Sequence, residues 1–328
     1  MGFEISKLRL VLLAVAVLLL SASTFRAQQE AGQVSVQLSA VDKEGRPVEG
    51  LKPEDLRVTV EGQPQNVLSL SRRADEPLHV VIMLDASASQ ERVLPFTQEA
   101  SDRLVPALLT RGAANDAAVV SFTGDVKVVQ GLTADPASVR RAIASVEFEP
   151  PSGYMGGGVL VGTPSPNNKP SGSTAVWDAL VDVCDKVFKR AQAGRRVVLL
   201  VTDGVDTSSR IKPDKAVEHL LREGVAVYGV GIGDERSFQG VDVSSVRKVS
   251  ERTGGRALFP KKNGDLPVAF EQVRRELLTS YALSFAAPAP RRDGKPLKLR
   301  VEVVNPELRR QGVQLAHPQS LFMEPGRQ

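Results

Sequence analysis

The hydrophobic pattern of this chain changes twice along its length. In residues 28–75 and again in residues 281–328, apolar and polar positions alternate in short runs separated by turns, which is typical of strands with one buried face. These runs are Val34–Leu38, Leu56–Val60, Val67–Leu70, Tyr281–Phe285 and Leu297–Val303. Each terminal segment is too short to close a sandwich alone. We therefore expect the two segments to pair in space and form one small β-sandwich.

Residues 76–280 follow a different pattern, in which apolar strands alternate with helical segments. A run such as Val197–Val201 has no polar face, and a strand buried on both faces is typical of a parallel sheet covered by helices. The expected strands are Leu78–Leu84, Ala117–Phe122 running on through Val126–Val129, Arg196–Thr202, Val225–Ile232 and Arg256–Phe259. The expected helices are Leu94–Leu109, Pro136–Val146, Thr174–Gln192, Pro213–Glu223, Val243–Thr253 and Leu266–Thr279. The alternation predicts an α/β domain with a doubly wound, mostly parallel sheet, inserted between the two β segments.

The N-terminus carries the pattern of an export signal. Lys7 and Arg9 precede the apolar run Leu10–Leu20, and small residues follow at 21–23, which is typical of a signal peptide over residues 1–27. The apolar run is shorter than the roughly 20 residues that span a bilayer. We therefore predict a protein that is secreted or resides in the periplasm or cell envelope. The alternative is an uncleaved segment that anchors the chain to the membrane.

Composition narrows the class of function. The 42 Lys and Arg residues against 38 Asp and Glu residues give a formal net charge of +4, and no dense basic stripe with interleaved aromatic residues is present. A nucleic-acid partner is therefore not expected. The single cysteine, Cys184, cannot form an internal disulfide. It shares the apolar face of a helix with Trp177 and Leu180, so we interpret it as a buried small side chain rather than a nucleophile.

The residues that could bind a ligand or a metal follow apolar strands or begin a helix. Asp85, Ser87 and Ser89 follow the first strand of the middle region, Thr174 begins a helix, and Asp203 follows a later apolar strand. Open α/β sheets bind ligands beyond the carboxyl ends of their strands, and oxygen ligands suit Mg²⁺, Mn²⁺ or Ca²⁺. Taken singly, Ser or Thr before a helix is a common cap and Asp-Gly is a common turn. Together and in this order, the five residues predict a divalent-cation site.

On these residues the chain resembles the von Willebrand factor type A domain with a metal-ion-dependent adhesion site. The family pattern is Asp-x-Ser-x-Ser, then a Thr, then an Asp that ends the fourth strand, and the resemblance spans about residues 78–280. It implies a Rossmann-like fold and a metal site formed by all five residues. The flanking segments 41–48 and 281–285 are similar to a family of exported proteins known mainly from acidobacteria, although the Gly-Tyr ending of that family is missing here.

The resemblance implies a binding protein rather than an enzyme. In the family, hydroxyl oxygens contact the cation directly and carboxylates act partly through water. The cation, most simply Mg²⁺, then stays under-neutralised and takes an acidic residue from a partner. We expect a non-enzymatic adhesion protein whose partner is a protein or cell-surface ligand that offers a Glu or Asp. The long loop 149–173, rich in Pro, Gly and Ser, is expected to border the site because it ends at Thr174.

Two alternatives stay open. In the first, the protein is a scaffold of the cell envelope and the metal only stabilises it. In the second, it is a metal-dependent hydrolase, which needs a base or nucleophile beside the ion. His79 and His219 are expected away from the predicted sheet edge, His317 lies in a tail without a readable pattern, and Asp206 reads as a solvated turn residue. Gly229–Gly233 resembles part of a dinucleotide fingerprint but lacks its context, so we interpret it as a closely packed strand end.

Overall fold

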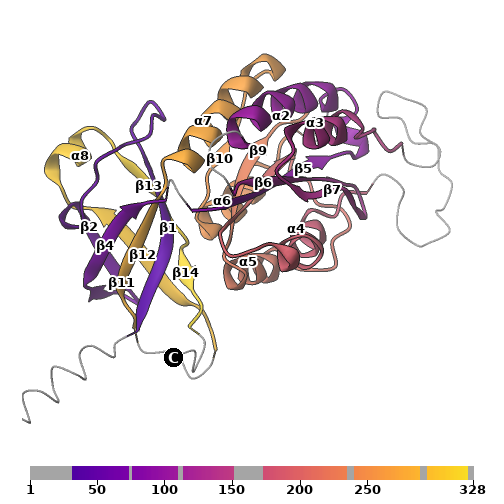
Figure 1. The fold of residues 1–328 in the computed structure, drawn as a ribbon. Coiled ribbons are helices and arrows are strands. Elements are labelled where there is room, and N and C mark those ends of the chain that lie inside the picture. Colours follow the sequence, from indigo (N-terminus) through magenta and orange to yellow (C-terminus); the bar gives the residue numbers. More distant parts are fainter. Residues whose placement is uncertain are drawn as a thin grey trace, which may run out of the picture.

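The computed structural model of the protein describes residues 32–73, 76–109, 114–150, 173–234, 240–288 and 294–323. The expected signal peptide and most of the 149–173 loop lie outside these ranges, so both stay predictions. The described chain forms an α/β domain beside two small antiparallel sheets (Figure 1), which confirms the predicted fold class. Within the described ranges, no helix combines the length and the apolar character needed to cross a membrane.

The α/β domain is built on a six-stranded sheet with the order β10-β9-β8-β5-β6-β7. The strands are β5 (Leu78–Asp85), β6 (Asp116–Phe122), β7 (Val126–Thr133), β8 (Arg195–Thr202), β9 (Val225–Gly231) and β10 (Ala257–Leu258). Neighbours from β10 to β6 run parallel, and β7 at the edge is antiparallel. β5 and β9 are buried along their whole length, as their continuous apolar runs predict.

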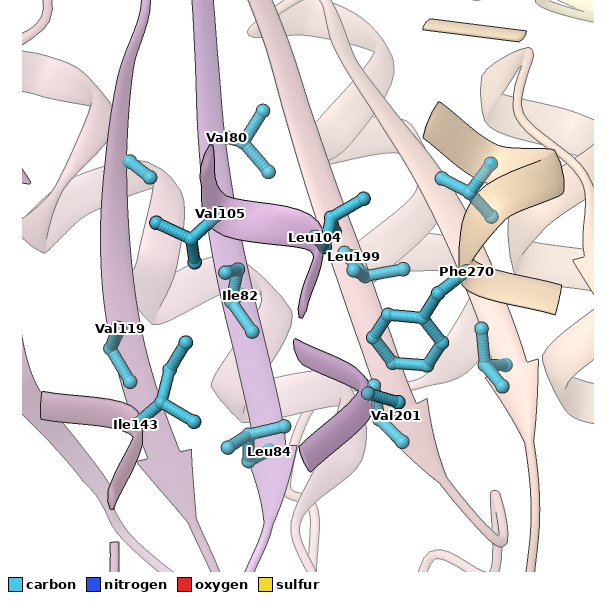
Figure 2. Close-up of a cluster of buried hydrophobic side chains, with 14 of the residues drawn as sticks. Val80, Ile82, Leu84, Leu104, Val105, Val119, Ile143, Leu199, Val201 and Phe270 are labelled. Atoms are coloured by element: carbon cyan, nitrogen blue, oxygen red, sulfur yellow. The ribbon is translucent and has the colours of Figure 1, made fainter. Parts of the chain in front are cut away.

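Helices cover both faces of this sheet (Figure 1). They are α2 (Leu94–Leu109), α3 (Pro136–Ala144), α4 (Val176–Lys186), α5 (Pro213–Arg222), α6 (Val243–Thr253) and α7 (Leu266–Leu278). α2, α3 and α7 pack on one face, and α4, α5 and α6 pack on the other. In the core of the first face, Ile82 and Leu84 of β5 and Val201 of β8 lie against Leu104 of α2 and Phe270 of α7 (Figure 2). The two cores hold the carboxyl ends of the strands in place.

Two predicted elements differ from the structure. The single strand expected over residues 117–129 is a hairpin, because the chain turns at Thr123–Asp125 and β7 returns antiparallel to β6. Apolar residues continue on both sides of the turn, and that continuity imitates one strand. The helix expected to run to Gln192 ends at Lys186, and a 3₁₀ turn follows at Phe188–Arg190.

The glycines at the end of β9 allow helix α6 and the chain after β10 to approach the sheet closely. A Cβ on Gly229 would lie 2.6 Å from a methyl group of Val246, and a Cβ on Gly231 would lie 2.6 Å from the ring of Phe259. Both distances are shorter than any real carbon contact. The interpretation of Gly229–Gly233 as a closely packed strand end is confirmed.

The two ends of the chain form the predicted β-sandwich. Its strands are β1 (Gln33–Val41), β2 (Leu56–Val60), β3 (Gln63–Gln65), β4 (Val67–Arg72), β11 (Tyr281–Ala286), β12 (Leu297–Val303), β13 (Gln314–Ala316) and β14 (Ser320–Leu321), with the short helix α8 (Pro306–Arg310). One sheet has the order β13-β1-β11-β4 and the other β14-β12-β2-β3. Each sheet therefore joins N-terminal to C-terminal strands. Leu38, Leu283 and Phe285 are fully buried in the shared core.

The tail after β13 belongs to this sandwich, although its sequence gives no signal for it. The Nε2 atom of His317 accepts a hydrogen bond from the N–H of Val301 at 3.2 Å, and Nδ1 lies 2.8 Å from the carbonyl oxygen of Pro318. β14 then pairs with β12. The ring of Phe322 lies 3.8 Å from the guanidinium of Arg222 on α5, so the tail also contacts the α/β domain.

Candidate metal centre

The predicted ligands gather at the carboxyl edge of the central sheet. β5 has β6 on one side and β8 on the other, so the order of strands reverses beside β5, where open α/β sheets bind their ligands. Asp85 is the last residue of β5, and Asp203 directly follows β8. Because these two strands are parallel neighbours, the fold brings two carboxylates from distant parts of the sequence to one place.

Asp85 is held by neutral hydrogen-bond donors. The residue is 3% exposed. Its Oδ1 atom accepts a hydrogen bond from the backbone N–H of Ser87 at 2.9 Å, and Oδ2 accepts one from the hydroxyl of Thr202 at 2.6 Å. The Thr202 oxygen in turn accepts from the N–H of Gly204 at 3.0 Å. Gly204 has a φ of +77°, and a Cβ there would lie 2.5 Å from a side chain of α6, so this turn needs glycine.

Asp203 is buried to the same degree and also has neutral partners. Its Oδ1 atom accepts from the backbone N–H of Val205 at 3.0 Å, and Oδ2 accepts from the side-chain amide of Gln90 at 3.1 Å. Gln90 also donates to the carbonyl oxygen of Ile232 at 3.4 Å. The backbone oxygen of Asp203 accepts from the N–H of Asp242 at 2.7 Å. The loops after β5, β8 and β9 therefore all contribute to fixing this residue.

Ser87 and Ser89 complete a cluster of oxygen atoms with the two carboxylates. Their hydroxyl oxygens are 3.2 Å apart, with Ser87 buried and Ser89 half-buried. The Ser89 hydroxyl also hydrogen-bonds the carboxylate of Asp203, which works to lower the pKa of that carboxyl. The structure thus brings together four of the five predicted ligands.

Thr174 reaches the same edge of the sheet through backbone contacts. The N–H of Ala175 donates to the carbonyl oxygen of Thr123, which directly follows β6, at 2.9 Å. The N–H of Thr174 donates to the hydroxyl of Thr207 at 2.8 Å, and its carbonyl oxygen accepts from the N–H of Thr207 at 2.8 Å. These contacts place Thr174 between the loops that follow β6 and β8. Because they involve its backbone, the role of its hydroxyl as a ligand stays a prediction.

The two carboxylates form a buried negative centre. Their hydrogen bonds described above come from backbone N–H groups, two hydroxyls and an amide, none of which carries charge. Burial, followed by repulsion from Asp203, raises the pKa of Asp85, and burial also raises the pKa of Asp203. Two carboxylates buried side by side favour either a shared proton or a cation.

The donor set fits a hard divalent cation. In the part of the chain that the structure describes, no three His, Cys, Asp or Glu side chains are grouped so that they could hold a metal. The other side-chain oxygen atoms gathered beside the two carboxylates are the hydroxyls of Ser87 and Ser89. A site made only of oxygen atoms suits Mg²⁺, Mn²⁺ or Ca²⁺ rather than the softer metals.

Three residues position the site in ways that the sequence pattern did not reveal. Gln90 and Thr202 hydrogen-bond the carboxylates, as described above. Asp206 is half-buried rather than solvated, and its Oδ2 atom accepts from the N–H of Trp177 at 3.3 Å, at the start of α4. The prediction of a solvated turn residue was wrong because the helix that Asp206 caps lies in another part of the sequence.

The other candidate groups lie away from this edge. His79 is near the start of β5, where its Nδ1 atom is 2.7 Å from Oδ1 of Asp116, and His219 is on α5. His317 lies in the sandwich. Cys184 is 1% exposed, and its burial, with a smaller contribution from nearby carboxylates, raises the pKa of its thiol to about 12. Its interpretation as a buried side chain is confirmed, and its lack of reactivity stays a prediction.

An open α/β sheet covered by helices on both faces, with a buried oxygen cluster at the reversal of its strand order, defines a domain of the doubly wound class. Residues 80–205 and residues 165–272 each match a model of the von Willebrand factor type A domain. The chain therefore contains a von Willebrand factor type A domain, and the central sheet with its helices is that domain.

Individual relatives are distant. A protein of Borreliella burgdorferi is 23% identical over 226 residues, which are 63% of this chain and 59% of that protein. Proximal thread matrix protein 1 from the mussel byssus is 20% identical with a TM-score of 0.48, over 63% of this chain and 50% of that one; another of its structures has a zinc-occupied MIDAS motif. A von Willebrand factor type A protein from Catenulispora acidiphila is 14% identical with a TM-score of 0.48, over 84% of this chain and 72% of that one. This chain thus spans 59% of the first of these proteins and 50% of the second.

Proposed function

We propose that this protein is an exported, non-enzymatic binding protein that binds its partner through a divalent cation. Asp85, Ser87, Ser89, Thr174 and Asp203 would hold the cation, most simply Mg²⁺. The observation that carries the proposal is the pair of buried carboxylates whose hydrogen bonds all come from neutral donors. When bound, the cation supplies positive charge and an open coordination position for a carboxylate oxygen of a protein or cell-surface ligand.

The residues around the two carboxylates support binding of a partner rather than catalysis. The serine and threonine oxygens would be neutral ligands. They would therefore not reduce the attraction of the bound cation for an external anion. The two carboxylates are fixed by hydrogen bonds and share no contact with a histidine, because the three histidines lie elsewhere in the fold. A hydrolase would need a base or nucleophile at the ion.

A titration with metal alone tests the first half of the proposal. Wild type should bind Mg²⁺ in calorimetry, and D85N should lose that binding, because the substitution removes a charged ligand while keeping its size. D102N is the matched control, since Asp102 is a half-buried aspartate of α2 that pairs with Arg140 at 2.7 Å, away from the two carboxylates. Equal Mg²⁺ affinity in wild type and D85N would contradict the proposed site.

A capture experiment tests the second half. Immobilised wild-type protein should retain a partner in the presence of Mg²⁺ and release it on addition of a chelator, whereas D85N should retain nothing. Partner binding that persists in D85N, with its fold intact by circular dichroism, would favour the alternative of an envelope scaffold whose metal only stabilises the domain.

Export forms part of the proposal and has its own test. The positive residues, the apolar run and the small residues near the N-terminus support cleavage near residue 27. N-terminal sequencing of the protein from its native host should begin close to that position. Recovery of the intact N-terminus in the membrane fraction would show an anchored protein instead.

A further inference from the structure

We propose that Gln90 is a positioning residue of the cation site, which acts through Asp203 and favours a small cation over a larger one. The inference rests on the proposed function, because it assumes that Asp203 is a metal ligand. Gln90 lies directly after Ser89 but belongs to no predicted ligand set.

The burial of Gln90 requires an explanation, and its contacts supply one. The residue is 1% exposed, and an amide buried without partners costs a few kcal/mol, roughly 1–3 by mutational series. Its Nε2 atom donates to Oδ2 of Asp203 at 3.1 Å and to the carbonyl oxygen of Ile232 at 3.4 Å. These partners lie 113 and 142 residues further along the chain. Gln90 thereby ties the ends of β5, β8 and β9 together at the carboxylate.

The chemistry of an amide suits this position better than that of a charged side chain. An amide N–H fixes the orientation of a carboxylate and leaves its negative charge available to a cation. A Lys or Arg at the same place would neutralise the carboxylate and compete with the metal. The nearby Arg92 illustrates the difference, because its guanidinium is paired with Asp234 at 3.4 Å rather than with Asp203.

The rigidity of the carboxylate bears on the choice of cation. Mg²⁺ demands a near-ideal octahedron with ligands at about 2.0–2.1 Å, whereas Ca²⁺ accepts six to eight ligands at about 2.3–2.6 Å in flexible geometry. A carboxylate that hydrogen bonds on both oxygens hold in one orientation therefore suits the strict geometry of Mg²⁺ better than the flexible geometry of Ca²⁺. Loss of one of these bonds frees Asp203 and should harm Mg²⁺ binding more than Ca²⁺ binding.

Gln98 provides a matched control on the neighbouring helix. It is a partly buried glutamine of α2 whose Nε2 atom donates to two backbone carbonyls, those of Ile143 at 2.7 Å and Val146 at 2.8 Å. It has the same chemistry and two hydrogen bonds to lose, but it contacts neither carboxylate. A general loosening of the domain should follow from either substitution, whereas a change in metal preference should follow only from the loss of Gln90.

The experiment compares wild type, Q90M and Q98M by calorimetry with Mg²⁺ and with Ca²⁺. In Q90M, we expect Mg²⁺ affinity to fall by about 10–100-fold and the ratio of Mg²⁺ to Ca²⁺ affinity to fall with it. Q98M should keep the wild-type affinities and ratio. Q90L serves in the same test if Q90M does not fold. An unchanged Mg²⁺ affinity and ratio in the folded Gln90 variant, with wild type binding normally, would overturn this inference alone. Absence of Mg²⁺ binding in wild type would overturn the proposed function as well.

Discussion

The two ends of the central sheet treat buried charge in opposite ways. At the amino ends of the strands, acidic and basic side chains are paired: His79 lies 2.7 Å from Asp116, and Arg196 lies 3.4 Å from Glu223. At the carboxyl ends, two buried carboxylates lie together and receive hydrogen bonds from uncharged donors. The same sheet therefore pairs acidic with basic side chains at one end and brings two acidic side chains together at the other.

This difference separates a structural role from a binding role. An acidic and a basic side chain in contact stabilise each other within the fold, and removing one partner leaves the other without that contact. Two carboxylates side by side repel each other, their hydrogen bonds come from neutral groups, and a proton or an added cation would stabilise them. The comparison thus predicts opposite responses to the neutralisation of one aspartate at each end.

The largest effect is expected at the carboxyl end. D85N removes one of two repelling charges, so the metal-free protein should lose no stability, while the stabilisation by Mg²⁺ should disappear. For wild type, that stabilisation amounts to about 2.7 kcal/mol when free Mg²⁺ is a hundredfold above its Kd, and a chelator should remove it. Thermal unfolding with Mg²⁺ and with chelator measures both quantities. Marked destabilisation of metal-free D85N would show that the carboxylate is structural.

Neutralising Asp116 at the amino end should lower the stability of the metal-free protein and leave the stabilisation by Mg²⁺ unchanged. D116N deprives the buried His79 of its charged partner, and the expected loss is about 1–3 kcal/mol of unfolding free energy. Mg²⁺ should stabilise this variant as much as it stabilises wild type. Denaturant unfolding with and without Mg²⁺ provides the measurement. A change in the Mg²⁺ effect would mean that the two ends of the sheet are coupled.

The sandwich adds a half-buried histidine, His317, whose surroundings favour the neutral form. Burial lowers the pKa of His317, and its Nε2 atom already accepts a hydrogen bond. The unfolded chain therefore binds a proton more readily than the folded one. Stability from this residue is complete above pH 6.5 and falls as the pH drops below that value, by at most about 1.4 kcal/mol per pH unit. The difference in unfolding free energy between wild type and H317Q, followed from pH 7.5 to 5, should shrink in acid; a constant difference would contradict this.

The smallest effect is expected at Cys184, where burial is the main cause of the raised pKa. Since its pKa is raised to about 12, the native thiol should fail to react with a thiol reagent at pH 8 and should react fully in denaturant. Metal should change nothing, because α4 holds this side chain in the core of the opposite face from α2. Rapid labelling of the native protein would show that this core opens readily.

Much of the site could be predicted because it depends on strand ends. Asp85 and Asp203 follow continuous apolar runs, and the carboxyl ends of parallel strands share one edge, so their meeting follows from the pattern. The pairing of the terminal β segments could be predicted for a similar reason, since alternating strands need a second buried face. These inferences use only local periodicity and one rule of topology.

The remaining features depend on contacts that periodicity does not encode. The partners of Gln90 lie 113 and 142 residues away, and Asp206 caps a helix whose Trp177 is 29 residues earlier. The hairpin between β6 and β7 was missed because apolar residues flank the turn on both sides. The two-residue strand β14 is too short to produce any alternation. A metal, a partner and export are likewise left to experiment.

The interleaving of the chain ends has a consequence for the order in which the protein folds. The N–H of Lys298 in β12 donates to Glu61 beside β2 at 2.7 Å, across 237 residues of sequence. During synthesis, β1 and β2 emerge long before their partners exist, and closing so large a loop in a disordered chain is slow and entropically costly. Once the α/β domain has folded, it brings Arg73 and Ser280 within hydrogen-bonding distance, 3.0 Å from N to O. The inserted domain thus acts as the template that lets the sandwich close last.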